Sequence, residues 1–265
     1  MTAPRIHEPN GNAWLTGVTA LSSNDVWTVG VSATSTLTEH WNGNRWSAVS
    51  SPSPSPVNWH ARPPEGQNFL YDVGGSSSSE VWAVGDFSFT FGRSKALIEH
   101  WNGTSWTLTH LANSHVDSQG LDSVSSLSGN DVWAVGYETV GTAASLRSKP
   151  LIEHWNGTRW SILPSPEARH GQSVLTGLGG VAAISTDNVW ALGSASNING
   201  LPLPAAHPVI IHWDGQSWRR SETPVTRSSM SDLSEIAGTR SSLWAIGFSG
   251  VKGEQKALIE HRVGC

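Results

Sequence analysis

The segment Asp131-Val-Trp-Ala-Val-Gly136 decides the fold, because variants of it recur along the whole chain. Its counterparts are Asp25-Val-Trp-Thr-Val-Gly30, Glu80-Val-Trp-Ala-Val-Gly85, Asn188-Val-Trp-Ala-Leu-Gly193 and Ser242-Leu-Trp-Ala-Ile-Gly247. The tryptophans of successive copies are 55, 51, 57 and 54 residues apart. Self-similarity at a nearly fixed period indicates a repeat architecture, in which each unit is one supersecondary element.

A second block follows the first at a variable distance and ends in a turn signal. It is found as Thr38-Glu-His-Trp-Asn-Gly43, Ile98-Glu-His-Trp-Asn-Gly103, Ile152-Glu-His-Trp-Asn-Gly157 and Ile210-Ile-His-Trp-Asp-Gly215. Each copy leads to a further tryptophan, at Trp46, Trp106, Trp160 and Trp218, whereas the fifth copy reads Ile259-Glu-His-Arg-Val-Gly-Cys265. The repeat thus accounts for all 15 tryptophans except Trp14 and Trp59.

Each unit predicts four short strands, because its apolar residues alternate and its Asn-Gly or Asp-Gly pair is a hairpin signal. Five four-stranded units of about 54 residues are typical of a propeller, whose blades cover one another's faces. We therefore expect an all-β, five-bladed β-propeller that forms a single domain over residues 1–265. The expected blade units are approximately 15–69, 70–120, 121–177, 178–232 and 233–265, with residues 2–7 supplying the missing outer strand and closing the ring.

The glycine of the second strand and the tryptophan that begins the fourth resemble the galactose-oxidase and kelch group of propellers. The blade count and the tryptophan content are similar to those of the five-bladed tachylectin lectins. Both resemblances extend over the whole chain and imply a propeller. A single glycine, such as Gly85 or Gly136, stands where kelch repeats carry two consecutive glycines.

Composition excludes several classes of partner. The 16 basic and 21 acidic residues give a net charge of -5 without a basic cluster, which argues against nucleic acid. No apolar stretch approaches the roughly 18 residues of a membrane span, and the first residues lack the apolar core of a secretory signal, so we expect a soluble protein. Because Cys265 is the single cysteine, no internal disulfide can form. The compartment and the oligomeric state stay open, and the motifs indicate neither a cofactor nor a metal.

Loop lengths distinguish the two rims of the expected disc. The turns between strands one and two and between strands three and four hardly change from unit to unit. The connections from strand two to three vary from the short 32–36 to the long 195–208, and those from strand four to one vary similarly. Because the variable connections emerge at one rim, and loops on a rigid scaffold often carry function, we expect the site there, at the mouth of the central channel.

Residues that break the repeat are the candidates for function. The ligand-binding candidates lie at the channel mouth or in the variable loops: Trp59, His60, Arg62, Tyr71, Asp86, Phe87, Tyr137 and Arg169. The catalytic candidates are carboxylates and histidines suited to acid–base chemistry: Asp72, Asp122, Glu138, His60 and His170. The histidines repeated in every unit, such as His100 and His154, are interpreted as packing or hydrogen-bonding residues between blades instead of a metal-binding ring.

Three functions are compatible with these observations. The first is lectin-like binding of a carbohydrate or small molecule, supported by the tryptophan content and the five-fold repetition. The alternative is a metal-free enzyme, a cyclase, lyase or glycosidase, because the candidate residues differ from blade to blade as one central site requires. The third is a protein-binding disc, which would expose large apolar patches.

Overall fold

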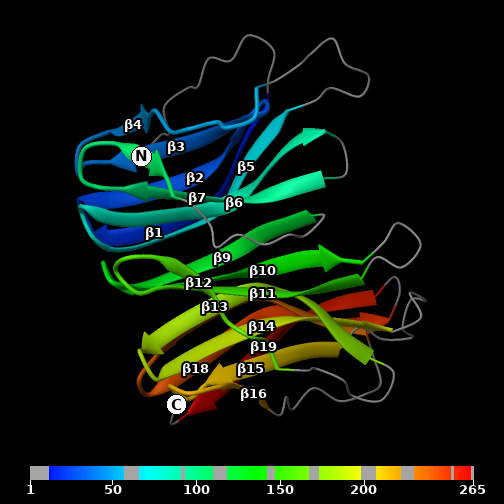
Figure 1. Ribbon diagram of the computed structural model, residues 1–265. Helices are drawn as coiled ribbons and strands as arrows, with labels where there is room; N and C mark the ends of the chain where they lie inside the picture. The colour runs from blue at the N-terminus through cyan, green and yellow to red at the C-terminus, as the bar shows by residue number, and fades with distance from the viewer. Residues whose placement is uncertain are drawn as a thin grey trace.

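The computed structural model has five antiparallel sheets that form the blades of a β-propeller, which confirms the predicted fold class (Figure 1). It describes residues 12–56, 66–90, 93–109, 118–141, 147–166, 173–197, 207–221, 230–251 and 254–263. These residues form strands, turns and irregular segments without a helix. Accordingly, the described chain includes no helix that could cross a membrane.

The strands follow one another in sequence from the inner to the outer edge of each blade. Blade 1 consists of β1 (Ala13–Ser22), β2 (Asp25–Ser32), β3 (Ser35–Trp41) and β4 (Trp46–Val49). Blade 2 consists of β5 (Gln67–Ser77), β6 (Glu80–Thr90), β7 (Arg93–Trp101) and β8 (Trp106–Leu108). Blade 3 consists of β9 (Ser118–Ser128), β10 (Asp131–Val140), β11 (Arg147–Trp155) and β12 (Trp160–Ile162).

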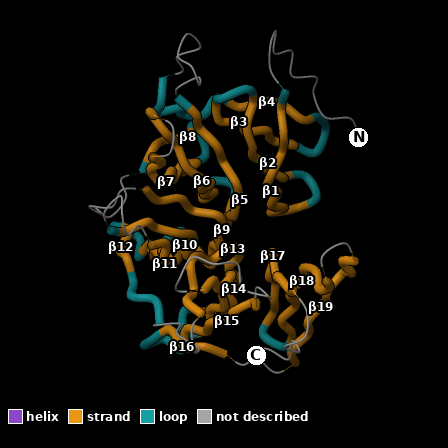
Figure 2. Tube along the Cα trace, turned by 90° about the vertical axis from the view of Figure 1, so that its right-hand side faces the viewer, coloured by secondary structure: helices purple, strands orange, loops and turns teal. Residues whose placement is uncertain are grey.

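The last two blades continue the pattern. Blade 4 consists of β13 (Ser173–Ser185), β14 (Asn188–Asn197), β15 (His207–Trp213) and β16 (Trp218–Ser221). Blade 5 has three described strands, β17 (Met230–Thr239), β18 (Ser242–Val251) and β19 (Glu254–Val263). The first strand of blades 2 to 5 packs on the first three strands of the preceding blade, and the innermost strands face a common centre (Figure 2).

Tryptophan clusters form the cores of the blade junctions. Trp27 of blade 1 packs against Trp101 and Trp106 of blade 2, with ring centroids 4.8 and 5.3 Å away, and stacks on His40 at 4.3 Å. Trp82 and Trp133 make the same contacts with the tryptophan pair of the next blade. Because the second-strand tryptophans Trp27, Trp82, Trp133 and Trp190 are only 1–3% exposed, they cannot serve as platforms for sugar rings.

The repeated glycine of the second strand permits a close approach of the innermost strand. A Cβ atom on Gly85 would lie 1.9 Å from the carbonyl oxygen of Phe69, and the other four glycines are equally constrained. At the same point the register shifts, since Leu70 pairs with Gly85 but Asp72 pairs with Val84. The residue between them, Tyr71, is a β-bulge, and its counterparts are Thr16, Asp122, Gly179 and Ser234. Bulges redirect side chains and are common near functional sites.

The first and last blades each leave one face exposed. Trp14 and Val18 of blade 1 are 56% and 67% exposed, and Trp244 and Ile259 of blade 5 are 47% and 63% exposed. No extensive strand contact joins blade 5 to blade 1 within the described residues, and Figure 2 shows the two blades apart. Residues 2–7, predicted to complete blade 5 and close the ring, lie outside the described part of the chain, so that closing strand stays a prediction.

Candidate functional site

The strand ends that flank the variable connections all lie at one rim of the propeller, on the right in Figure 1. The opposite rim carries the short turns that keep their length in every blade. There Gly43, Gly103, Gly157 and Gly215 adopt positive φ angles of 87–91°, as a tight turn after the Asn or Asp requires. The two rims therefore differ in chemistry. The rim with the short turns carries similar residues from blade to blade, whereas the rim with the variable connections carries different residues in each blade.

An acidic cluster lies in the half of blades 2 and 3 nearer the variable rim; we define it as Tyr71, Asp86, Ser94, Asp122 and Tyr137. The Asp86 carboxylate is its centre: Tyr71 donates a hydrogen bond to Oδ1 at 3.3 Å and Tyr137 donates one to Oδ2 at 3.5 Å. The Ser94 hydroxyl lies 3.2 Å from that of Tyr137. Two phenols from neighbouring blades thus orient one carboxylate.

Asp122 is the second carboxyl group of the acidic cluster and occupies the bulge of β9. Burial raises its pKa to about 6, and the negative charge of Asp86 adds to the rise. Burial also raises the pKa of Asp86, although hydrogen bonds from Tyr71, Ser94 and Tyr137 oppose this effect. The pKa of the Tyr71 phenol is raised by burial and by Asp86, so Tyr71 remains a neutral donor. Two coupled carboxyl groups in different surroundings can divide the roles of acid and base.

Two other predicted catalytic residues, Asp72 and Glu138, have partners outside the acidic cluster. Asp72 points into the junction with blade 3, where its Oδ2 accepts hydrogen bonds of 2.9 Å from the Ser123 hydroxyl and from the backbone N–H of Val124. Glu138 is buried and forms an ion pair with Lys149 at 2.6 Å. Phe87, predicted to bind ligand, packs against the core between blades 1 and 2. The structure thus brings Tyr71, Asp86, Asp122 and Tyr137 together and leaves these three residues outside the acidic cluster.

The remaining predicted site residues, Trp59, His60, Arg62, Arg169 and His170, lie outside the described residues. Sequence reasoning missed Ser94 and Ser118, whose hydroxyls lie 2.9 Å apart beside Tyr137. A serine recurs at the Ser94 position as Ser148, so the repeat gave no signal for a special role. The interaction of Ser94 with Asp86 depends on the register between β6 and β7, in which Asp86 pairs with Ala96.

The repeated histidines take part in packing and hydrogen bonding, as the sequence indicated, but these contacts lie within one blade and not between blades. His40, His100 and His154 each place Nε2 within 2.8–2.9 Å of the acidic residue that opens the second strand, namely Asp25, Glu80 or Asp131. Each also stacks on the tryptophan of its own second strand. Across the described ranges, no three His, Cys, Asp or Glu side chains gather in a group that could hold a metal ion.

We predict that Asp122 titrates with a midpoint near pH 6 and that Asp86→Asn lowers this midpoint, because the substitution removes the neighbouring negative charge. Carboxyl-detected NMR over pH 3–8 would measure both values, with Asp214→Asn on the opposite rim as a control that leaves the midpoint in place. An Asp122 midpoint near the ordinary value of about 4 would contradict the electrostatic description of the acidic cluster.

Comparisons with known proteins support the fold. No family model matches the chain, and no curated protein matches it. An α-L-arabinanase from Penicillium chrysogenum, solved with arabinobiose, superposes with a TM-score of 0.53 at 10% identity over 99% of this chain and 84% of that one. A thermostable family-43 glycoside hydrolase gives 0.50 at 10% identity over 98% and 92%, and a Dyadobacter fermentans protein of unknown function gives 0.53 at 10% over 81% and 68%. At this identity the likeness establishes a β-propeller and leaves the kelch resemblance unconfirmed.

Proposed function

We propose that this propeller cleaves glycosidic bonds of a carbohydrate at its variable rim, with Asp86 and Asp122 as the acid–base pair. The observation that carries the proposal is the proximity of these two half-buried carboxyl groups across blades 2 and 3: the charge of Asp86 raises the pKa of Asp122, and Tyr71 and Tyr137 orient Asp86. The arabinanase and the family-43 glycoside hydrolase, which share the fold, are named for action on carbohydrates. The names of these two neighbours are consistent with a carbohydrate as the substrate of this propeller.

The chemistry of glycoside hydrolysis fits the acidic cluster. Such enzymes need one carboxylic acid to protonate the leaving oxygen and one carboxylate to act as base or nucleophile. A pKa of about 6 keeps about half of Asp122 protonated at pH 6 and about a tenth at pH 7, far more than an ordinary aspartate, which suits the acid. Asp86 accepts hydrogen bonds from two phenols, which favour its ionised form and fix its orientation, and this suits the base.

Differences between blades favour an enzyme over a lectin with equivalent sites. At the bulge, Tyr71 and Asp122 correspond to Thr16, Gly179 and Ser234 in the other blades. After the second-strand glycine, Asp86 and Tyr137 correspond to Val31, Ser194 and Phe248. The carboxylates and phenols of the acidic cluster therefore occur once among the five blades. Lectin-like binding loses its main support, because the second-strand tryptophans are buried in the junctions.

A release assay for reducing ends, run over a panel of α- and β-linked oligosaccharides, tests the proposal. Asp122→Asn and Asp86→Asn are each expected to lower kcat by about 10²–10⁴-fold, the usual contribution of a positioned acid or base. Asp214→Asn, in a turn of the opposite rim, is the matched control and should retain full activity. Saccharide binding without turnover would support the lectin-like alternative, and turnover unchanged in both cluster variants would contradict the assignment of Asp86 and Asp122.

A further inference from the structure

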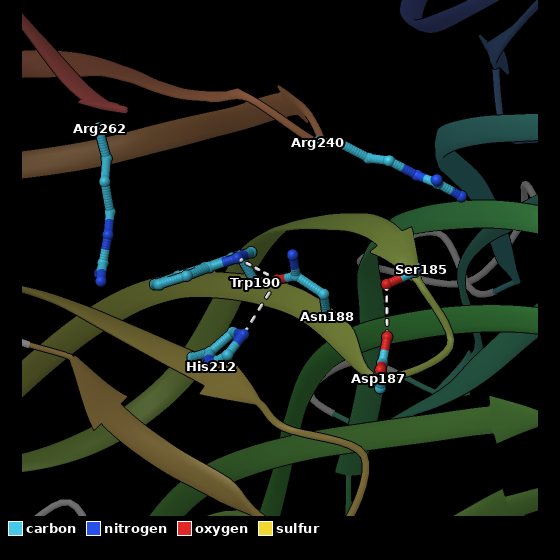
Figure 3. A pocket seen from close by; sticks show the side chains of 7 residues that line it. All are labelled: Ser185, Asp187, Asn188, Trp190, His212, Arg240 and Arg262. Atoms are coloured by element: carbon cyan, nitrogen blue, oxygen red, sulfur yellow. Dashed lines mark hydrogen bonds between the residues drawn. The ribbon is translucent and has the colours of Figure 1, made fainter. Parts of the chain in front are cut away.

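A pocket of about 650 Å³ opens between blades 4 and 5 on the rim with the short turns, away from the acidic cluster (Figure 3). Its lining includes Asn188, Trp190 and His212 of blade 4 and Arg240 and Arg262 of blade 5. A volume of this size is within the range of about 300–1,000 Å³ found for small-molecule sites. The pocket therefore has room for a sugar unit.

The pocket exists because blade 5 departs from the repeat at this junction. In blade 4, Trp213 pairs with Val189 of the second strand, and it packs on Trp133 of blade 3. The equivalent position of blade 5, which pairs with Leu243, is Arg262. Its guanidinium lies 4.6 Å from the ring centroid of Trp190 and donates a hydrogen bond to the Ser221 hydroxyl at 3.0 Å. A cation thus replaces an indole ring over the second-strand tryptophan.

Two further departures from the repeat, at Asn188 and Arg240, also make the local charge more positive. The acidic residue that opens the second strand in blades 1 to 3 is Asn188 in blade 4. The first residue of the turn before the second strand is small and uncharged in blades 1 to 4, but in blade 5 it is Arg240. Asp187 stands where blades 1 to 3 have Asn24, Ser79 and Asn130, so its carboxylate offsets the one lost at Asn188. The net change relative to those junctions is the gain of two guanidinium groups.

Hydrogen bonding determines which end of Asn188 is available to a ligand. Its Oδ1 accepts bonds from Trp190 Nε1 at 2.7 Å and from His212 Nε2 at 3.0 Å. The amide nitrogen, a donor, consequently points toward blade 5, as Figure 3 shows. Burial and the charge of Arg262 lower the pKa of His212, so its ring is neutral at pH 7. The pocket lining therefore includes two guanidinium groups and an amide donor, which are groups that bind oxyanions; in Figure 3 the Arg240 side chain extends away from Arg262.

We propose that this junction pocket binds the carboxylate of an acidic saccharide, a uronic acid unit. Guanidinium groups recognise carboxylates through paired, charge-assisted hydrogen bonds, and the amide nitrogen of Asn188 is a further donor in the pocket lining. The assignment to a saccharide rests on the proposed action on carbohydrates. The acidic cluster and this pocket would then be separate sites on opposite rims.

Calorimetric titration with a glucuronate-containing disaccharide, its neutral glucose analogue and inorganic phosphate tests the proposal. We expect the acidic disaccharide to bind at least about 10-fold more tightly than the neutral one, since a factor of ten corresponds to one modest charge-assisted contact. Arg240→Ser and Arg262→Trp restore residue types found at these positions in other blades, and each should weaken binding about 10-fold or more. Arg159→Ser, in an exposed turn of blade 3 on the same rim, should bind as the wild type does.

The outcomes separate this proposal from the proposed function. Equal affinity for the acidic and neutral disaccharides would overturn the assignment of the pocket as a carboxylate site. Binding of the acidic disaccharide that neither Arg240→Ser nor Arg262→Trp weakens would also overturn it. Neither result would affect the proposed cleavage by Asp86 and Asp122. Phosphate binding as tight as that of the disaccharide would overturn the saccharide assignment. Uronate binding that survives Asp122→Asn and is weakened by Arg240→Ser would support the pocket as an independent site.

Discussion

Trp82→Ala is expected to lower the free energy of unfolding by about 3–5 kcal/mol, the usual cost of removing a large buried aromatic side chain. Trp82 is 1% exposed and lies between His100 of its own blade and the pair Trp155 and Trp160 of blade 3. Removal of its indole leaves a cavity lined by the neighbouring rings. The cavity stays open because the paired strands hold these rings in place. Urea unfolding followed by circular dichroism would measure the loss.

Trp244→Ala is the matched control, because Trp244 occupies the same repeat position in blade 5 but is 47% exposed. It stacks on His261 at 3.8 Å and has no tryptophan pair from a following blade against it in the described structure. Its loss is therefore expected to cost less than about 1 kcal/mol, as for most exposed substitutions. A cost equal to that of Trp82→Ala would show that the exposed face of blade 5 is covered in solution, as complete ring closure predicts.

Stability is expected to fall as the pH rises from about 4.5 to 8, because two buried glutamates bind protons more tightly in the folded state. Glu99 and Glu153 of the third strands are fully buried, and burial raises the pKa of each to about 8. An interaction with Ser51 opposes the rise for Glu99, whereas the charge of Glu138 adds to it for Glu153. Both carboxyl oxygens of Glu153 lack a hydrogen-bond partner within the described residues.

The direction in which the free energy of unfolding changes with pH follows from the number of protons that each state binds. Between the unfolded pKa of 4.5 and the folded value of about 8, the native state holds a proton that the unfolded chain releases. The free energy of unfolding therefore decreases by up to about 1.4 kcal/mol per pH unit for each group, and the decrease ends above the folded pKa. Below pH 4.5 both states are protonated, and the stabilisation is fully present.

Glu99→Gln and Glu153→Gln each remove one titrating group and should flatten the slope. Urea midpoints measured at pH 5, 6, 7 and 8 would give the slope for each variant. Ile211 fills this position in blade 4 with no exposed surface, which shows that the junction accepts an uncharged side chain. Stability that rises from pH 5 to 8, or a slope unaffected by both substitutions, would contradict the assignment of these glutamates.

Much of the fold could be predicted from sequence, because equivalent residues make the same packing contacts in successive blades. The tryptophan period predicts the number of blades. The turns of constant length predict which rim has the same structure in every blade. The single second-strand glycine has a physical reason that the sequence alone does not give: it allows the carbonyl of the innermost strand to approach within a distance that excludes a Cβ atom.

The candidate site could be predicted only in part, because a bulge decides which of two adjacent residues faces the acidic cluster. Tyr71 and Asp72 are neighbours in sequence, yet Tyr71 contacts Asp86 whereas Asp72 bonds to Ser123 across the junction. Alternation alone cannot predict this division, since the register shift interrupts it. Likewise, Arg240 and Arg262 break the repeat visibly, but only the strand register brings them to one pocket.

The most direct test of the central claim is a crystal structure of Asp122→Asn with an oligosaccharide that the wild-type protein cleaves. The substitution should slow turnover enough to retain the intact sugar. The scissile glycosidic oxygen is expected to lie within hydrogen-bond distance of residue 122, with Asp86 on the opposite side of the sugar ring. A sugar bound elsewhere on the propeller, with Asp86, Asp122 and both tyrosines free of contact, would contradict the account.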